Sequence, residues 1–521
     1  MAADYGRNLY RQYEEGLAKN DALIEANKEL KREIRALKKD GASDLAAERA
    51  NHRKETKAIK DAHAADTALL LAAIARLEEE VRRLRAMIDK NSSNSSKPPS
   101  SDGPGKPRKN IPNGRAKTGR RLGGQPGHKG NIPILCEAPD SVTDLRPDIC
   151  GCGGKIAYEG NPVRKQAVEI IIKKHIREYR DEEGVCALCG KRHRVKFPAG
   201  IHNPVNIGAG LKALVSMLNV EYAMPLGKIA RFVSEMTEGE VRLANGAIVN
   251  SCKELCGKIE PSIRTVKEKL FLSPVLHKDE TGVKVNGERH WLHTLTAGDF
   301  AYYHADTKRG NDADEAMGVL AGYGGVLVHD HLKGLYAWKC KHAECNSHIL
   351  RYLIGVLENE PEYAAHAEEM SGFFVNADNE RKEAKKRGEA AFPDDRIKSF
   401  GDAYDGILRR WEETVREVTG KAKSKKSRYK REGEKLCPRL AEYKEQHLLF
   451  LRDSNVPFDN NLAERSLRGI KTKTKVSGGF RVQLGADTYA GVRTYIETLR
   501  RHKQNIFRGI TSAFAGNPVL F

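Results

Sequence analysis

The sequence predicts a multidomain protein of the α+β class. Residues 1–90 hold few glycines and prolines and repeat apolar residues at heptad spacing. Residues 91–130 are rich in Ser, Pro, Gly, Lys and Arg, a composition that builds no core. From residue 272 the apolar period changes from that of helices to that of strands. A chain of 521 residues is also long enough for several domains of about 100–200 residues each.

The charge of the chain indicates a polyanionic partner. Lys and Arg number 90 against 70 acids, which gives a net charge of +20, and cations that neutralise phosphates release condensed counterions. The alternative is a basic surface that only keeps the protein in solution. No stretch reaches the roughly 18 apolar residues of a membrane span, and the N-terminus lacks the apolar core of a secretory signal. We therefore expect a cytoplasmic, nucleoid-associated protein with reduced cysteines and no membrane partner.

The leader, residues 1–90, is predicted to be a coiled coil. Apolar residues alternate spacings of four and three at Leu70, Ile74, Leu77, Val81, Leu84 and Ile88. A second series is Leu23, Leu30, Ile34 and Leu37, with Asn27 at a core-type position where a buried Asn can fix register. A coiled coil would make the protein a homo-oligomer. The alternative is a helical hairpin that packs on its own chain.

Two small regions follow the leader. Residues 91–130 are interpreted as a linker, and their Lys and Arg also suit a basic arm that becomes ordered on phosphates. Residues 131–200 hold two close cysteine pairs whose four thiolates could close a tetrahedral zinc site. These residues are Cys150, Cys152, Cys186 and Cys189. The alternative is two unligated pairs in a small β unit.

Residues 201–265 are predicted to be helical, because GLKALVSMLNVEYA and PLGKIARFVSEM repeat apolar residues at helical spacing. Two short helices around the turn at Gly239 could form a helix-turn-helix that binds DNA. The same pattern serves in any helical bundle, so both interpretations stay open.

A run of strands begins at residue 272. LSPVLHKDET, ERHWLHTLTAG and DFAYYHAD predict a three-stranded meander, NDADEAMGVLAGY a helix, and GGVLVHDH a buried fourth strand. Asp279 closes the first strand and Asp330 the fourth. A β-β-β-α-β order lets these two strands lie side by side and parallel. Both carboxylates would then emerge at the same edge of the sheet, where open sheets place their sites.

Two carboxylates held close together repel each other, and a divalent cation such as Mg²⁺ relieves the repulsion. Glu464 is the candidate for a third ligand, on a helix whose start is marked by Pro457, Asp459 and Asn460. Single acids at strand ends are commonly surface or capping residues. Competing acids nearby are Glu280, Asp299, Asp306, Asp453 and Asp459. One face of the predicted helix carries Glu464, Arg468, Lys471 and Lys475, which could offer the metal a carboxylate and DNA several cations.

Six segments together form a specific pattern: NSSNSSKPPSSDG at 91–103, GGQPGHKG at 123–130, DETGVKVNGERHWLH at 279–293, GVLVHDHLKGLYAW at 325–338, CNSHILR at 345–351 and VPFDNNLAERSLRGIKTKTKVSGGFR at 456–481. On these segments the chain resembles the IS66 family of bacterial insertion-sequence transposases over nearly its whole length. Three features depart from the family pattern: C-x-C at Cys150, Ile349 and Tyr352 in place of His and Glu, and RRHKQN near the C-terminus. None of these changes touches the three acids.

The resemblance implies a ribonuclease-H-like catalytic core of the DDE type. It would span residues 266–483, with a helical insertion at about 352–450 and C-terminal helices at 484–521. Asp279, Asp330 and Glu464 would hold two Mg²⁺ or Mn²⁺ ions. Cys345, His348 and Arg351 could support the site. Expected DNA contacts are Arg468, Lys471, Lys473, Lys475 and Arg481.

The predicted function is that of a transposase. It would bind the ends of its element, cut the DNA to a 3′-OH and join that end to target DNA by two-metal catalysis. Its partners would be double-stranded DNA, a second copy of the chain and accessory proteins of the same element. The rival hypotheses are a catalytically inactive transposase that binds DNA and a structural coiled-coil scaffold.

Overall fold

The computed structural model describes residues 2–36, 44–95, 125–127, 134–147, 149–158, 162–198, 200–389, 392–420 and 430–521. The chain forms two compact units. The first unit joins Met1–Asn113 to Asn346–Ser454, and the second joins Gly114–Cys345 to Asn455–Phe521. Most of the predicted linker at 91–130 lies outside the described residues. Among the described helices, none has the length and apolar character needed to cross a membrane.

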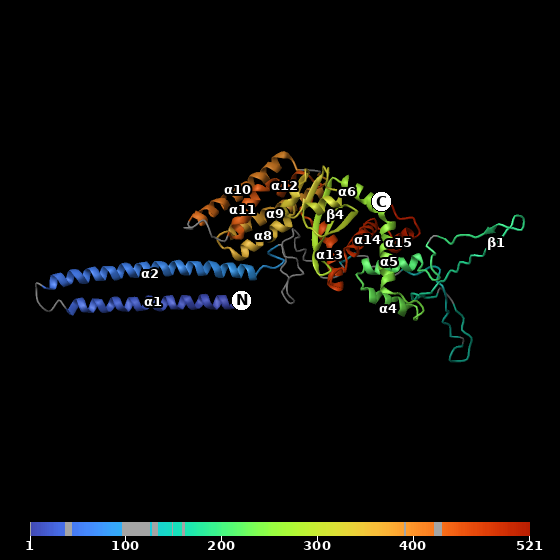
Figure 1. Cartoon of the computed structure of the whole chain (residues 1–521), viewed down its shortest axis with the longest axis horizontal. Helices are drawn as coiled ribbons and strands as arrows, with labels where there is room; N and C mark the ends of the chain where they lie inside the picture. The colour runs from blue at the N-terminus through green and yellow to red at the C-terminus, as the bar shows by residue number, and fades with distance from the viewer. Residues whose placement is uncertain are drawn as a thin grey trace. The chain divides into compact units, whose positions relative to one another are not determined.

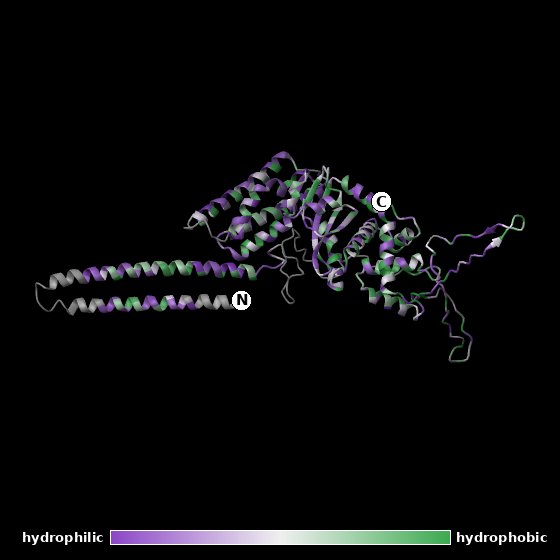
Figure 2. Cartoon of the chain, in the orientation of Figure 1, coloured by the Kyte–Doolittle hydropathy of each residue, from purple (hydrophilic) through white to green (hydrophobic). Residues whose placement is uncertain are grey.

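The leader is a pair of long helices, α1 (Ala2–Ala36) and α2 (Asp44–Ile88), that pack side by side in the first unit (Figure 1). Apolar residues concentrate in the middle of α2 (Figure 2). There Leu70 approaches α1 so closely that a Cβ added to Gly16 would lie 2.7 Å from its Cδ2 atom. The prediction that the leader is helical is confirmed. The contact between α1 and α2 lies within one chain, as the alternative of a helical hairpin expects. Leu37 lies outside the described residues, and oligomerisation through the leader stays a prediction.

The described residues from Asn346 to Arg452 of the first unit are mainly helical. It comprises α8 (Asn346–Asn359), α9 (Ala364–Lys386), α10 (Asp394–Gly420), α11 (Glu432–Glu442) and α12 (Lys444–Arg452). Trp411 and Tyr404 are fully buried, and the Tyr404 hydroxyl donates to the Leu440 carbonyl at 2.9 Å. A helical insertion between the second and third acids was therefore predicted correctly.

The end of α2 and residues 89–95 are folded onto this helical unit. Arg431 bridges Glu79 of α2 and Glu362, each at 2.8 Å. The side chain of Asn94 donates to Glu358 at 2.8 Å and accepts from the Asn91 amide at 2.8 Å. The placement of residues 91–95 in a linker was wrong, because their own side chains satisfy the turn and bury it.

The first two described strands of the second unit form a small β hairpin, β1 (Gly184–Val185) and β2 (Arg192–His193). Four helices follow, as predicted for 201–265: α3 (Ala209–Val220), α4 (Leu226–Met236), α5 (Asn245–Lys258) and α6 (Glu260–Phe271). After the sheet come α13 (Asn461–Ser477), α14 (Gln483–Arg501) and α15 (Ile506–Phe514).

The central sheet has the order β5-β4-β3-β6-β7. Its strands are β3 (Val275–Val285), β4 (Glu288–Ala297), β5 (Phe300–Asp306), β6 (Val326–His329) and β7 (Lys341–Glu344), with α7 (Asn311–Met317) between β5 and β6. β3, β4 and β5 form the predicted antiparallel meander, and β3 pairs parallel with β6. The predicted crossover is therefore confirmed. The sequence analysis missed β7, whose four residues KHAE carry no alternating apolar pattern.

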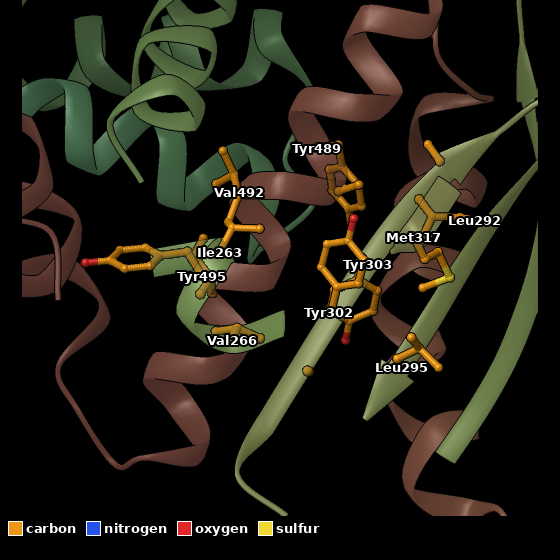
Figure 3. Packing of buried hydrophobic residues seen from close by; sticks show 14 of the residues in the cluster. Ile263, Val266, Leu292, Leu295, Tyr302, Tyr303, Met317, Tyr489, Val492 and Tyr495 are labelled. Carbon is orange, nitrogen blue, oxygen red and sulfur yellow. The ribbon is translucent and has the colours of Figure 1, made fainter. Parts of the chain in front are cut away.

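The sheet has helices on both faces. α13 and α14 pack on one face, where the Tyr303 hydroxyl donates to the Ser466 carbonyl of α13 at 3.2 Å. α6 packs on β4 and β5. Figure 3 shows Tyr303 and Tyr489 side by side within the buried cluster that joins α14 to the sheet. The apolar core therefore fixes the helix that carries Glu464 against the strand that carries Asp279.

A charged network is buried on the face of β3 that points away from Asp279. Lys278 is fully buried, and its Nζ lies 3.1 Å from both Glu280 and Asp314 and 3.2 Å from His293. Burial opposes the charge of Lys278, but Glu280 and Asp314 raise its pKa. Burial also opposes the charge of Glu280, whose pKa is nevertheless lowered by Lys278 and Arg309. The ammonium group thus joins β3, β4 and α7.

We expect Lys278→Met to loosen this part of the sheet, since the acids would stay buried without their shared cation. Breaking a buried pair by removing one partner costs about 3 kcal/mol or more. Amide hydrogen exchange of β3 and β4 should accelerate. Lys284→Met is the matched control, because Lys284 lies on the same strand and is exposed. Equal exchange rates in both variants would contradict the stabilising role of Lys278.

Candidate active site

Asp279 and Asp330 are placed side by side by the register of β3 and β6. The parallel pairing ends at His277 and Val328. Asp279 lies two residues further along β3, and Asp330 lies two residues after Val328, directly after the end of β6. Side chains two residues apart point to the same face. The expectation that Asp279 closes its strand was wrong, because β3 continues to Val285 in its hairpin with β4. Only the pairing between β3 and β6 stops before the acids, so neither acid takes part in the pairing of these two strands.

Glu464 lies in the first turn of α13, on the same face of the sheet. Its backbone N–H donates to the Asn460 carbonyl at 3.2 Å, the first hydrogen bond of the helix. The helix start predicted from Pro457, Asp459 and Asn460 is confirmed. Residues from three separate segments of the chain therefore meet where the pairing of β3 with β6 stops.

The electrostatics of Asp279 reflect this meeting. Burial raises the pKa of its carboxyl well above the ordinary value, and the nearby carboxylates of Asp330, Glu280 and Glu464 raise it further. The Glu280 amide donates to Asp279 at 2.8 Å and opposes the shift only in part. Asp279 thus lies in a field of negative charge that one or more cations would neutralise.

The donor set fits divalent ions that prefer oxygen ligands. The oxygens of the three acids do not all lie within 4.8 Å of one another, so one ion does not touch all three in this arrangement. Two ions roughly 3.5–4 Å apart extend the reach of such a set. The three acids offer the oxygen ligands that Mg²⁺ prefers, and the number of ions stays a prediction.

The competing acids are engaged elsewhere. Glu280 faces the buried network with Lys278 and Arg309. Asp306 lies 3.4 Å from His304, and Asp459 accepts from the Asn461 amide at 3.0 Å. Asp299 is exposed in the turn between β4 and β5, and Asp453 belongs to the first unit. These contacts leave Asp279, Asp330 and Glu464 as the candidate metal ligands.

The segment after Asp330 is held by residues that the sequence analysis did not select. Glu344 of β7 accepts a hydrogen bond from the Tyr336 hydroxyl at 2.6 Å and contacts the ring of His331 at 2.5 Å. Of these residues, His331 belongs to the HDH motif at 329–331, in which only the central acid was considered.

The three expected supporting residues are divided between the two units. Cys345 follows β7 in the second unit, is buried, and accepts a hydrogen bond at 3.2 Å from the Asn460 amide. His348 and Arg351 lie on α8 in the first unit. The contact of Cys345 is thus with the start of α13, and the roles of His348 and Arg351 stay predictions.

The cysteine pairs remain apart. Within each pair the thiols interact: hydrogen bonds from the Gly154 backbone and from Cys150 lower the pKa of Cys152, and backbone hydrogen bonds and Cys189 lower that of Cys186. In the described part of the chain, no three of the four sulfurs lie close enough to share one ion. Zinc binding by Cys150, Cys152, Cys186 and Cys189 therefore stays a prediction that this arrangement does not support.

The basic residues expected to contact DNA differ in exposure. Arg468, Lys475 and Arg481 are exposed, and Lys471 is partly exposed. Lys473 is buried, and its ammonium group donates to the Asn219 carbonyl at 3.2 Å. The placement of Lys473 among the surface contacts was wrong, because its side chain points inward from α13 toward the end of α3.

Comparisons with known proteins agree with these features. The family model described as "Transposase IS66 family" matches residues 205–488. A second model, a family of unknown function (DUF6444), matches residues 24–132. The chain is similar to the "Uncharacterized protein y4hP" of Sinorhizobium fredii (strain NBRC 101917 / NGR234), at 24% identity over 408 residues that cover 71% of each chain.

The raised pKa of Asp279 leads to a prediction about stability. Between its unfolded and folded pKa, the folded carboxyl keeps a proton that the unfolded one loses. The stability of the metal-free protein should therefore fall as pH rises through that window. Asp279→Asn removes this loss, so its melting temperature should exceed that of the parent at neutral pH, and the difference should shrink below about pH 4.

Thermal unfolding in a chelating buffer checks this expectation. Asp299→Asn serves as the control, since Asp299 is exposed. A neutral-pH melting temperature for Asp279→Asn at or below that of the parent protein would show that the carboxyl is not under repulsion.

Proposed function

The chain belongs to the IS66 family of transposases, and from this premise we propose that it cuts DNA at the ends of an insertion sequence and joins them to target DNA. One observation carries the proposal: the register of β3 and β6 sets Asp279 beside Asp330, with Glu464 close enough to raise the pKa of Asp279. A carboxylate trio of this kind suits metal-dependent phosphodiester chemistry better than simple DNA binding.

The proposed site would hold two Mg²⁺ or Mn²⁺ ions. Such ions would supply an activated oxygen nucleophile and stabilise the charge of the leaving oxygen. Asp279 on β3 and Asp330 directly after β6 would take the ions, and Glu464 would complete the set from α13. Because the acids lie on a rigid sheet and a packed helix, they would need little rearrangement before binding substrate.

DNA would be held by cations that share α13 with Glu464. Arg468, Lys471 and Lys475 follow Glu464 at spacings of four, three and four, which places them along one face of the helix. Arg481 follows shortly after its end. A phosphate backbone lying along this face would lead to the three acids. Lys473 is excluded from this role by its burial.

The oligomeric state, accessory proteins and zinc content stay predictions. Two element ends must be brought together for transposition, and the α1–α2 hairpin is the segment that we expect to join two copies of the chain. The helices α3 to α6 remain candidates for recognition of the element ends.

The proposal is tested by substituting each acid with its amide. Asp279→Asn, Asp330→Asn and Glu464→Gln should each reduce Mg²⁺-dependent cleavage of DNA that carries the element ends below detection. Binding of the same DNA should remain within about threefold, because each change adds no bulk. Asp299→Asn and Asp306→Asn are controls that should keep cleavage.

Cleavage by Asp279→Asn in Mg²⁺ at the parental rate would contradict the assignment. End binding by the parent chain without cleavage in either metal would instead indicate an inactive, DNA-binding transposase.

The basic face of α13 gives a further prediction. The double variant Arg468→Gln/Lys475→Gln should bind DNA more weakly and reduce the slope of log affinity against log salt by about 1 for each cation removed. The control is Arg465→Gln on the same helix, whose side chain donates to the Asn461 carbonyl at 3.3 Å. An equal loss of slope in the control would show that the effect is not specific to this face.

A further inference from the structure

Asn460 occupies the position where α13 begins, four residues before Glu464, and it is 1% exposed. An Asn at the start of a helix commonly accepts a hydrogen bond from an amide in the first turn. Here the side chain makes no such bond to its own helix. Its two polar side-chain atoms contact strand β3 instead.

Both side-chain atoms of Asn460 contact β3 beside Asp279. The Oδ1 atom lies 2.9 Å from Nδ1 of His277, and the Nδ2 group donates to the Lys278 carbonyl at 2.7 Å. The Lys278 carbonyl belongs to the peptide bond that leads into Asp279. This pair of hydrogen bonds therefore fixes the backbone from which the Asp279 carboxyl extends.

The backbone of Asn460 contacts the other elements of the site. Its N–H donates to Cys345 Sγ at 3.2 Å, directly after β7, and its carbonyl accepts from the Glu464 N–H at 3.2 Å. In turn, the Cys345 N–H donates to the carbonyl of His329, the residue before Asp330, at 2.9 Å. One buried residue is thus connected, directly or through one residue, to the backbone beside all three acids.

Few other side chains could make these contacts. The contact to the Lys278 carbonyl needs a donor, and the contact to His277 needs an acceptor, both from one short planar group. An Asp offers no donor to the carbonyl when ionised, and an apolar residue would leave two buried polar groups unpaired, which is costly. The chemistry of Asn is therefore required by this position.

We propose that Asn460 is a positioning residue that sets the distance between Glu464 on α13 and Asp279 on β3, and with it the affinity of the site for its second metal ion. The inference rests on the proposed two-metal function. The role proposed for Asn460 differs from general support of the fold, because Leu467 and Ile470 also hold α13 through apolar contacts in the core. Loss of Asn460 should therefore shift the helix start and leave the fold in place.

The test uses Mn²⁺ binding to the full-length protein, followed by electron paramagnetic resonance. Asn460→Ala should weaken Mn²⁺ affinity by about 10- to 100-fold, the range found when residues that orient metal ligands are changed. Binding of element-end DNA in chelator should stay within about twofold. Raising the Mn²⁺ concentration should restore cleavage in Asn460→Ala but not in Glu464→Gln.

The matched control is Asn461→Ala, whose side chain contacts only its near neighbour Asp459 among the hydrogen bonds described. It should keep the parental Mn²⁺ affinity. If Asn460→Ala does not fold, Asn460→Asp decides the question: it keeps the shape and an acceptor for His277 and loses the donor to Lys278. It too should bind Mn²⁺ at least tenfold more weakly.

Parental Mn²⁺ affinity in a folded Asn460 variant would overturn this inference and leave the proposed function intact, provided that Asp279→Asn and Glu464→Gln weaken binding. If those two acid variants also bind Mn²⁺ as the parent does, the proposed function fails instead.

Discussion

The repulsion between Asp279 and Asp330 is the constraint on which the site depends. Parallel pairing of β3 with β6 sets Asp279 on β3 and Asp330 directly after β6 on one face of the sheet, and burial of Asp279 removes water that would screen its charge. Such an arrangement is unfavourable for a metal-free protein. It is retained by the apolar core, which fixes the sheet through α6 on one side and α13 and α14 on the other. The apolar core thus stabilises the fold, and the clustered acids destabilise it.

The alternation of side chains along β3 separates two sets of charge within three residues. Lys278 and Glu280 point to one face, where Asp314, His293 and Arg309 compensate them. Asp279 points to the other face, among acids. The face with Lys278 ties β3 to β4 and α7, and the face with Asp279 carries the acids of the proposed metal site. A single strand therefore serves both stability and the proposed chemistry, because its period of two residues keeps the functions apart.

The sequence allowed the main elements of this site to be predicted, and the misses have physical causes. The meander, the parallel crossover and the helix at Glu464 follow from local period and from turn residues, which are visible in a single chain. β7 was missed because four residues give no period, and residues 91–95 were taken as linker because a polar turn and a linker share a composition. Lys473 was counted among the DNA contacts with the other cations of its segment, although it lies off the helix face that carries Arg468, Lys471 and Lys475, and its contact with the Asn219 carbonyl joins segments far apart in sequence. Asn460 was recognised only as a helix start, because its contacts with His277, Lys278 and Cys345 join segments over a hundred residues apart in sequence.

The central claim is that three acids bind a pair of divalent ions. The most direct measurement is a crystal structure of the protein with Mn²⁺, located by anomalous scattering. The account predicts two peaks roughly 3.5–4 Å apart, bounded by the carboxylates of Asp279, Asp330 and Glu464. Mn²⁺ bound elsewhere, with these three carboxylates in contact with water alone, would contradict it.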